Sequence, residues 1–408
     1  MNRPVINGER MLSRLEQLGR IGGLSAGGCT RLALTDEDKA GRDQIVTWLR
    51  EAGATIYIDQ IGNIYGVVEG TAPGRPVMTG SHIDTVSRAG NLDGCYGVIA
   101  GIEMLQSIKD AGLQPRYSLG VTVFSNEEGV RFSPDLLGSR VIAKDISLDE
   151  ALAALSKDGK DFGEELKRIG YRGDLSPWEL IPQKFVELHI EQGPQLEASG
   201  VQIGVVEAVQ GHSWWQVVVE GCANHAGTTP MTLRKDAGAA AMELACALQS
   251  SALQGLPDVA TVGTFSLEPN AINVVPGRAR FTVDFRDAEN AKLRKADALL
   301  LFHAKKLEEN GFTVNLTSLS RSLSVSFDYG LCDVIEREAE RFGATTMRMV
   351  SGASHDAQMI ATLCPTAMLF VQSISGISHN PREKTPDTDL VMGAQILTET
   401  LWSLSTAG

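Results

Sequence analysis

Two stretches decide the fold: VMTGSHIDTV at residues 77–86 and SLGVTVFSNEEG at residues 118–129. Each opens with a short apolar and β-branched run, which is typical of a buried strand, and then turns polar at His, Asp or Glu. Between them, residues 96–111 have the apolar spacing of a helix. Strand, helix and strand in this order predict a βαβ unit. Functional side chains in such sheets gather at the carboxyl ends of strands, where these polar residues lie.

The chain on either side of this unit extends the pattern. Residues 9–19 have helical spacing, and residues 36–52 predict an amphipathic helix that begins after a Thr35 cap. Residues 55–58 and 64–69 predict two more strands. Near the C-terminus, helices from about residue 329, from His355 and over 390–405 alternate with strands at 346–350 and 366–371. Both ends of the chain therefore predict an α/β fold.

The middle of the chain follows another order. Strands at 214–220, 260–267, 279–285 and 313–319 combine with helices at 234–251 and 291–310 as β-α-β-β-α-β. This order is that of a split-βαβ, ferredoxin-like α+β domain. The predicted fold is thus an α/β mixed-sheet domain formed by residues 1–211 and 328–408, interrupted by an inserted α+β domain at 212–327.

Composition limits the function classes. The chain has 408 residues, 43% hydrophobic and 21% charged, which is typical of a folded globular protein. Its formal net charge of −13 repels phosphate backbones and anionic headgroups, which disfavours nucleic acid and membrane partners. Six scattered cysteines without a Cys-x-x-Cys pair favour reduced thiols. The N-terminus is amphipathic instead of signal-like, so we expect a cytoplasmic protein.

Several catalytic motifs are absent from the sequence. It contains no phosphate-binding G-x-x-x-x-G-K-[ST], no G-x-G-x-x-G after a strand, no G-x-S-x-G and no H-E-x-x-H. Ser354, His355 and Asp356 resemble a triad in composition only, because contiguous residues cannot converge with the histidine between the other two.

Metal-ligating residue types recur instead at turn positions. His82 and Asp84 are two residues apart, so on an extended segment both point to the same side. We therefore expect the carboxylate of Asp84 to hold the second ring nitrogen of a metal-bound His82. Asp93 lies at the start of the predicted helix, where it can reach a metal and even bridge two. The alternative for Asp93 is a helix N-cap.

Further candidates follow other strands. Glu127 and Glu128 diverge at a strand end, so one carboxylate can ligate a metal while the other faces a bound water; a solvated turn is the alternative. His189 has an apolar, strand-like setting in which a core histidine is the alternative, and His379 follows a buried strand. Together, these carboxylates and histidines fit a two-metal hydrolytic site.

These residues stand in strings that resemble one family. The sequence is similar to the hydantoinase/carbamoylase family of dimetal amidohydrolases, which includes N-carbamoyl-L-amino acid hydrolase, allantoate amidohydrolase and β-ureidopropionase, and which has an aminoacylase-like metallopeptidase fold. The similarity runs in the family's order from about Gly19 to Asp389. It rests on GSHIDTV (80–86), NLDGCYGV (91–98), NEEGVRF (126–132), ELHIEQGP (187–194), NHAGTTPM (224–231), NAINVVPG (270–277), SGASHDAQ (351–358) and GISHNP (376–381).

The resemblance implies two divalent metal ions per subunit, Zn²⁺ or else Mn²⁺, Co²⁺ or Ni²⁺. It implies that the inserted domain is a lid and dimerisation domain. By position, the implied ligands and base are His82, Asp93 and His189 for one metal, Asp93, Glu128 and His379 for the other, and Glu127 as general base.

Substrate contacts are implied in the same way. His225 of the inserted domain would reach the active site of a partner subunit in a homodimer and stabilise an oxyanion. Asn273, Gln192 and His355 match substrate-binding positions. Arg286 matches another, and its guanidinium suits a substrate carboxylate, although an ion pair with Asp284 or Asp287 is the alternative.

The expected reaction is therefore hydrolysis of the ureido C–N bond of an N-carbamoyl-L-amino acid. Allantoate, ureidoglycolate and β-ureidopropionate are alternative substrates. Within the same fold, an N-acyl amino acid deacylase or a dipeptidase is a further alternative, and a non-catalytic binding module is the alternative from another class.

Overall fold

The computed structural model describes residues 3–406 and divides the chain into two compact units. Unit 1 comprises Met1–Glu207 and Ser326–Gly408, and unit 2 comprises Ala208–Val325. The predicted α/β class with a mixed sheet is confirmed. Among residues 3–406, no helix has both the length and the apolar content that crossing a bilayer requires.

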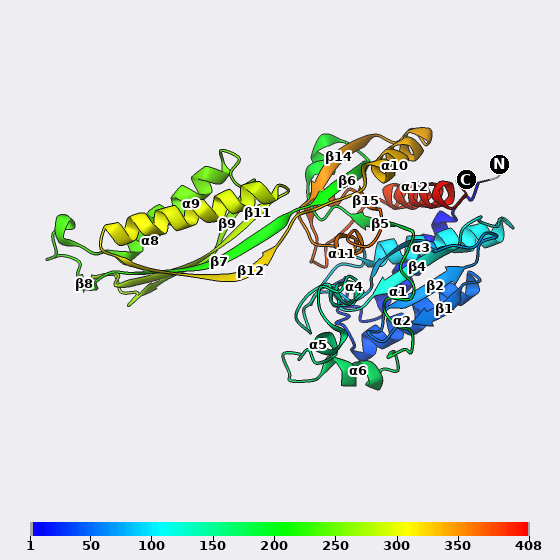
Figure 1. The fold of residues 1–408 in the computed structure, drawn as a ribbon, viewed down its shortest axis with the longest axis horizontal. Helices are drawn as coiled ribbons and strands as arrows, with labels where there is room; N and C mark the ends of the chain where they lie inside the picture. Colours follow the sequence, from blue (N-terminus) through cyan, green and yellow to red (C-terminus); the bar gives the residue numbers. More distant parts are fainter. Residues whose placement is uncertain (1–2, 407–408) are drawn as a thin grey trace. The chain divides into compact units, whose positions relative to one another are not determined.

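Unit 1 is built on a nine-stranded sheet in the order β1-β2-β4-β3-β5-β15-β6-β13, with β14 beside β6 (Figure 1). The four central strands β4, β3, β5 and β15 are mutually parallel. Strand β2 pairs antiparallel with β4, β1 pairs antiparallel with β2, and β6 pairs antiparallel with β15. The strands are β1 (Thr55–Ile58), β2 (Ile64–Val68), β3 (Val77–His82), β4 (Leu119–Phe124), β5 (Lys184–Ile190), β6 (Ile203–Val209), β13 (Val325–Ser326), β14 (Thr346–Ser351) and β15 (Thr366–Val371).

The central strands are buried on both faces. Every residue of β3, β4 and β15 is buried, as is typical of parallel strands covered by helices on either side. Strand β3 is longer than the predicted 77–79, because it stays paired with β4 as far as His82 opposite Phe124. Gly80 permits this pairing, since a Cβ there would lie 2.1 Å from the carbonyl oxygen of Thr122.

Helices cover this sheet. Helix α3 packs on β3, β4 and β5, and α12 packs on α3 and β15 (Figure 1). The predicted Thr35 cap is confirmed, because its side chain accepts a hydrogen bond from the N–H of Asp38. The helices are α1 (Gly8–Arg20), α2 (Asp36–Glu51), α3 (Cys95–Asp110), α4 (Leu137–Ile142), α5 (Leu148–Leu152), α6 (Phe162–Arg168), α7 (Gln195–Ser199), α10 (Tyr329–Arg341), α11 (Asp356–Ile360), η2 (Ile374–Gly376) and α12 (Asp387–Thr406).

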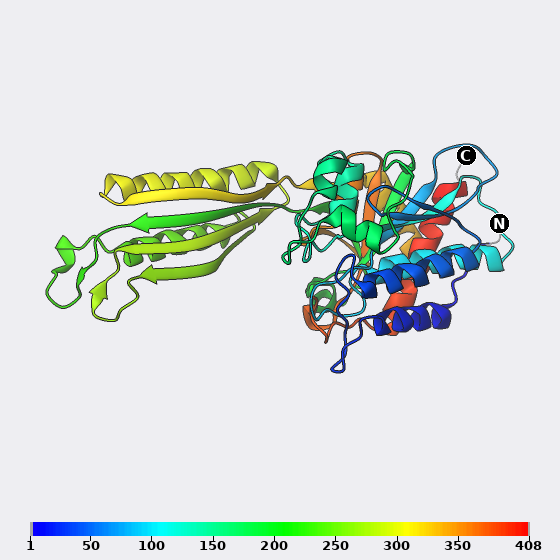
Figure 2. The ribbon, with the colours of Figure 1, turned by 90° about the horizontal axis from the view of Figure 1, so that it is seen from below.

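Unit 2 holds a four-stranded antiparallel sheet in the order β12-β7-β11-β9. Helices α8 and α9 lie side by side along one face of it (Figures 1 and 2). The split-βαβ order expected for this region is the order observed. Its elements are β7 (Gly211–Glu220), β8 (Asn224–His225), η1 (Met231–Leu233), α8 (Ala237–Ala252), β9 (Val259–Glu268), β10 (Val274–Val275), β11 (Arg278–Asp287), α9 (Asn290–Glu309) and β12 (Thr313–Ser322).

Buried apolar residues alternate with less buried ones along β11 and contribute to the core of unit 2. On β11, Ala279, Phe281, Val283 and Phe285 are buried in a cluster with apolar residues of α8 and α9. The residues between them therefore lie on the other face of the sheet. Helix α8 begins at Ala237, three residues later than predicted, because the side chain of Asp236 caps it by accepting the N–H of Ala239.

Candidate metal centre

The four parallel strands bring the expected ligands to one edge of the sheet of unit 1. His82 ends β3 and His189 lies one residue before the end of β5. Glu127 and Glu128 follow β4, and the loop after β15 carries His379. Because parallel strands end at the same edge, side chains from distant segments of the chain meet there.

Asp93, just before α3, stands at the middle of this cluster. Its Oδ1 is 3.2 Å from Nε2 of His189 and 3.8 Å from Nε2 of His82. Its Oδ2 is 3.0 Å from Nε2 of His379, and that nitrogen is 3.5 Å from Oε2 of Glu128. Two possible ligand groups result, His82–Asp93–His189 and Asp93–Glu128–His379, and they share Asp93.

The histidine rings are oriented as metal ligands require. Nδ1 of His82 is 2.9 Å from the carbonyl oxygen of Asp84, and Nδ1 of His189 is 2.9 Å from the carbonyl oxygen of Ile190. A carbonyl only accepts hydrogen bonds, so Nδ1 donates in both rings and Nε2 keeps its lone pair in the neutral form. Lone pairs and carboxylate oxygens that face one another without a proton between them need a cation, and this donor set suits first-row divalent ions.

The electrostatics of the cluster also favour positive charge. Burial lowers the pKa of His82 to about 4. For His189, burial acts in the same direction, but the carboxylates of Asp93 and Glu187 overcome it and raise the pKa to about 9. The carboxylates beside His189 therefore attract positive charge, which a metal ion at Nε2 would supply in place of a proton.

The carboxylate of Asp84 does not hold His82, and that prediction is wrong. Its oxygens instead accept the backbone N–H groups of Glu127, at 3.2 Å, and Glu128, at 3.3 Å. The backbone carbonyl of Asp84 makes the contact with His82. The physical reason is that the pairing of β3 with β4 ends at His82, and beyond it the carboxylate of Asp84 is occupied by the two N–H groups of the turn that follows β4.

Glu127 is buried next to a possible ligand. It is 8% exposed, and its Oε2 is 3.5 Å from Nε2 of His82, which excludes the solvated turn. Asn126 forms the turn with φ of 55°, and its side chain donates to two backbone carbonyls. Burial, together with the carboxylates of Asp356 and Glu128, raises the pKa of Glu127 well above its usual value.

Asp93 is not a helix cap. The N-cap of α3 is Gly94, and no side chain makes a capping hydrogen bond there. Glycine is required at 94 because φ is 63° and a Cβ would lie 2.4 Å from Nε2 of His82. The carboxylate of Asp93 is thus left to face the three histidines.

The sequence profile of peptidase family M20/M25/M40 matches residues 78–403. The chain belongs to this family. It is 38% identical to an N-carbamoyl-L-amino-acid amidohydrolase of Rhizobium meliloti, over 96% of this chain and 95% of that protein. It is 35% identical to an allantoate amidohydrolase of Escherichia coli K12, over 96% of each chain.

Solved structures agree with this membership. An amidase of the hydantoinase/carbamoylase family from Burkholderia multivorans superposes with a TM-score of 0.96, at 39% identity and with 99% of each chain covered. The resemblance to the hydantoinase/carbamoylase family is therefore confirmed, as is the prediction of an amidohydrolase.

Two of the expected substrate contacts lie within the metal centre of this M20 chain. Gln192 has φ of 58°, and its Nε2 donates to Oδ2 of Asp93 at 2.9 Å. Its Oε1 is buried without a hydrogen-bond partner among residues 3–406, so it can accept from a bound molecule. His355 is buried, with its ring centroid 4.6 Å from that of His189 and its Nε2 3.0 Å from Oγ of Ser351.

The other three expected contacts belong to unit 2. His225 is exposed on β8, and its Nδ1 accepts the N–H groups of Gly227, at 3.0 Å, and Thr228, at 3.1 Å. A neutral ring must then carry its proton on Nε2, which makes that atom a donor. Asn273 is exposed just before β10, the strand that pairs with β8. Arg286 pairs with Asp284 at 3.0 Å, the alternative that the sequence left open.

Two carboxylates of the centre were not predicted from the sequence. Glu187 is fully buried, accepts from Oγ of Ser81 at 2.7 Å, and lies in a possible ligand group with His189 and His355. Its position two residues before His189 on one strand was a usable signal. Glu383 accepts the backbone N–H of Asp93, and nothing in the sequence around Glu383 predicts this hydrogen bond.

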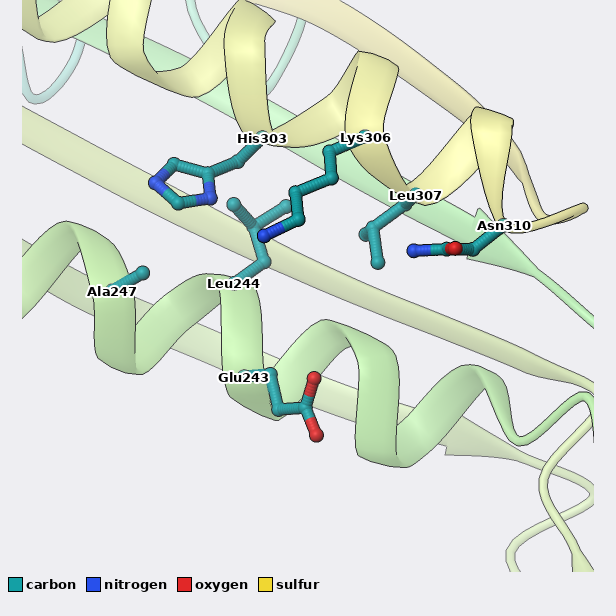
Figure 3. Close-up of a pocket in the computed structure, with 7 residues that line it drawn as sticks. All are labelled: Glu243, Leu244, Ala247, His303, Lys306, Leu307 and Asn310. Atoms are coloured by element: carbon teal, nitrogen blue, oxygen red, sulfur yellow. The ribbon is translucent and has the colours of Figure 1, made fainter. Parts of the chain in front are cut away.

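A groove of about 240 Å³ between α8 and α9 of unit 2 is of another kind (Figure 3). Glu243 is the one carboxylate among the described residues that line it, so the groove lacks the donor set of the metal centre. Figure 3 shows its side chains coming from both helices. They are Glu243, Leu244, Ala247, His303, Lys306, Leu307 and Asn310.

Proposed function

We propose that this protein is a dimetal amidohydrolase that removes the carbamoyl group of an N-carbamoyl-L-amino acid and yields the amino acid, carbon dioxide and ammonia. The observation that carries the proposal is the pair of ligand groups sharing Asp93, with the buried carboxylate of Glu127 beside them. The similarity to the Rhizobium meliloti amidohydrolase supports the substrate class.

The residues that would hold the metals are those of the two ligand groups. His82, Asp93 and His189 would hold one ion, and Asp93, Glu128 and His379 the other. Histidine and carboxylate ligands accept Zn²⁺, Mn²⁺, Co²⁺ or Ni²⁺. When bound, such ions polarise a carbonyl oxygen and lower the pKa of a water molecule.

Glu127 would move the proton. Its Oε2 takes a proton from the attacking water, and the raised pKa of this carboxylate suits a group that must hold that proton for part of the cycle. Attack on the ureido carbonyl forms a tetrahedral oxyanion. Glu127 then delivers its proton to the departing nitrogen, and the carbamate product breaks down to carbon dioxide and ammonia.

His225 and Arg286 would bind the parts of the substrate that carry negative charge. The protonated Nε2 of His225, fixed by the two N–H groups at Nδ1, donates to the oxyanion. Arg286 pairs with the substrate carboxylate by exchanging its contact with Asp284. Asn273, Gln192 and His355 complete the binding of the substrate.

We further propose a homodimer in which unit 2 is the dimerisation and lid domain and His225 acts on the partner subunit's substrate. Strand β9 is an edge strand, and its side chains of Val259 and Phe265 are exposed, which suits pairing with a second copy. A complementation experiment tests this. An equal mixture of Glu127→Gln and His225→Ala chains, dissociated and reassociated, regains about a quarter of wild-type activity, because half of the dimers are hybrids with one intact site. Continued inactivity of the mixture contradicts the arrangement.

The compartment is proposed from the thiols. All six cysteines are free, and Cys222 and Cys246 are exposed. Exposed free thiols persist in a reducing environment. This supports a cytoplasmic enzyme.

Allantoate is the second candidate substrate, because the Escherichia coli allantoate amidohydrolase is similar over nearly the whole chain. One experiment separates the candidates. Ammonia release by the Mn²⁺-loaded protein is measured with N-carbamoyl-L-amino acids, allantoate, ureidoglycolate and β-ureidopropionate, beside an EDTA-treated control. We expect chelator-sensitive release that is fastest with an N-carbamoyl-L-amino acid. Fastest release from allantoate would replace the substrate and keep the mechanism. No release from any of the four overturns the proposal and favours amide substrates such as N-acyl amino acids and dipeptides.

A further inference from the structure

Glu383 lies where two loops of the metal centre meet. Its Oε1 accepts the backbone N–H groups of Leu92, at 2.9 Å, and Asp93, at 3.2 Å. Its Oε2 accepts from Oγ of Ser378 at 2.8 Å. One side chain therefore joins the loop that carries Asp93 to the loop that carries His379.

The chain around Glu383 is shaped to admit it. A Cβ at Gly90 would lie 2.1 Å from Oε1 of Glu383, so glycine at this position leaves room for the carboxylate. Gln192 closes a ring of contacts, because its Nε2 donates to Oδ2 of Asp93 at 2.9 Å and to Oγ of Ser378 at 3.4 Å. Asp93 and the His379 loop are thus linked through both backbone and side chains.

The ligands of the two groups differ in how firmly the fold holds them. His82 and His189 lie on strands β3 and β5, where sheet hydrogen bonds fix the backbone and a carbonyl fixes each ring. His379 lies in a loop with φ of 51°, and its side chain is 52% exposed. The group that contains His379 therefore depends more on contacts between loops than the group that contains His82.

We propose that Glu383 is a positioning residue that fixes His379 against Asp93 and thereby sets the affinity of the Asp93–Glu128–His379 group for its metal ion. Both carboxylate oxygens of Glu383 accept hydrogen bonds from the protein. Glu383 therefore acts through Asp93 and the His379 loop and does not itself bind the metal ion. The inference rests on the proposed metal centre. Residues that hold metal ligands in place typically contribute 10- to 100-fold in metal affinity or activity, so we expect loss of Glu383 to weaken metal binding roughly 30-fold.

Stepwise binding of Co²⁺ tests the proposal. Calorimetry and the visible absorption of the bound ion measure the affinity of each step. Glu383→Ala removes all three hydrogen bonds, and we expect roughly 30-fold weaker binding at one of two sites and less than about 3-fold change at the other. His379→Ala identifies the affected step, since it should weaken the same one. Glu383→Gln keeps one carbonyl oxygen for Leu92 and Asp93, so its effect should be smaller than that of alanine.

Asp59→Asn is the matched control. Asp59 is also a buried loop carboxylate of unit 1, accepting the N–H groups of Ile61 and Asn63, but its partners are not the predicted ligands. The Asp59→Asn substitution should leave both Co²⁺ affinities unchanged.

If wild-type protein binds fewer than two Co²⁺ ions, the proposed metal centre fails. If wild-type protein binds two, and Glu383→Ala binds both unchanged or loses both equally, the positioning role is overturned and the centre stands. Should the alanine variant not fold, the near-isosteric glutamine variant decides by the same criteria.

Discussion

The candidate residues of unit 1 and unit 2 are held in opposite ways. In unit 1, His82 and Asp93 are 2% and 3% exposed, and they contact backbone groups and side chains from other segments, which include the buried His189 and the exposed His379. In unit 2, His225 and Asn273 are exposed. The imidazole ring of His225 is oriented by its own turn, because its Nδ1 accepts the N–H groups of Gly227 and Thr228.

This difference separates two tasks. A buried centre whose rings and carboxylates are fixed before any ligand arrives can set the geometry of metal ions, because little has to be reorganised on binding. Exposed groups keep their hydration until a substrate or a partner displaces it. Substitutions in unit 1 should therefore act on turnover and metal affinity, and those in unit 2 on oxyanion and substrate binding.

The largest expected effect is in unit 1. Glu127→Gln should lower kcat about 10³-fold, because the amide cannot take a proton from water. Steady-state kinetics and metal analysis of the same preparation measure it. Metal content should stay at the wild-type level, since the proposed ligands are unchanged. Near-normal turnover with metals bound contradicts the role of Glu127 as base.

The next effect belongs to unit 2. His225→Ala should lower kcat about 100-fold through loss of one oxyanion donor, with unchanged Co²⁺ affinity. His212→Ala is the matched control, because His212 is a histidine of unit 2 that is hydrogen-bonded to Ser320 and Ser322. The kcat of this variant should equal that of the wild type. Weaker Co²⁺ binding in His225→Ala would remove the proposed division of tasks between the units.

A smaller loss is expected for Asp84→Asn. One carboxylate oxygen becomes an amide donor, so one of the N–H groups of Glu127 and Glu128 loses its acceptor. We expect a decrease in kcat of roughly 30-fold with KM little changed, measured against the Asp59→Asn variant. An effect on KM alone would show that Asp84 does not act through the base.

The smallest effect is expected for Arg286→Lys. The ammonium cannot pair with a carboxylate in the bidentate geometry of a guanidinium, so KM should rise about 10-fold with kcat nearly constant. Arg280→Lys is the control, because Arg280 lies on the same face of β11. Equal changes in both variants would indicate a general effect of replacing a guanidinium group on this face and not a specific contact.

Predictability from sequence depended on the length and regularity of each element. Strands β1 and β15 have the predicted bounds, and α2 begins at the predicted cap. Helices α4, α5 and α6 were not predicted, because five to seven residues carry too little periodicity. The end of β3 was placed too early, because its last residues are polar and only pairing with β4 shows that they are strand.

The same distinction holds in the site. His82, Asp93, Glu128, His189 and His379 could be singled out by residue type, by their positions at strand ends and by the family strings, and the structure places them together. Asp84 was assigned to the wrong partner, because sequence spacing does not show that the backbone N–H groups of Glu127 and Glu128, 43 and 44 positions further along the chain, reach its carboxylate. Glu383 was missed, because its contacts with Leu92 and Asp93 span nearly 300 residues of chain, 291 and 290 positions.

The sequence predicts the α/β class, the inserted split-βαβ pattern, the family and the residue types of a two-metal centre, since these depend on local periodicity and on short strings. The three-dimensional structure was needed to show that the backbone of Asp84 orients His82 while its carboxylate holds Glu127, and that Glu383 joins two ligand loops. Such contacts form when parallel strands end at one edge and their loops fold over it, so no local pattern encodes them.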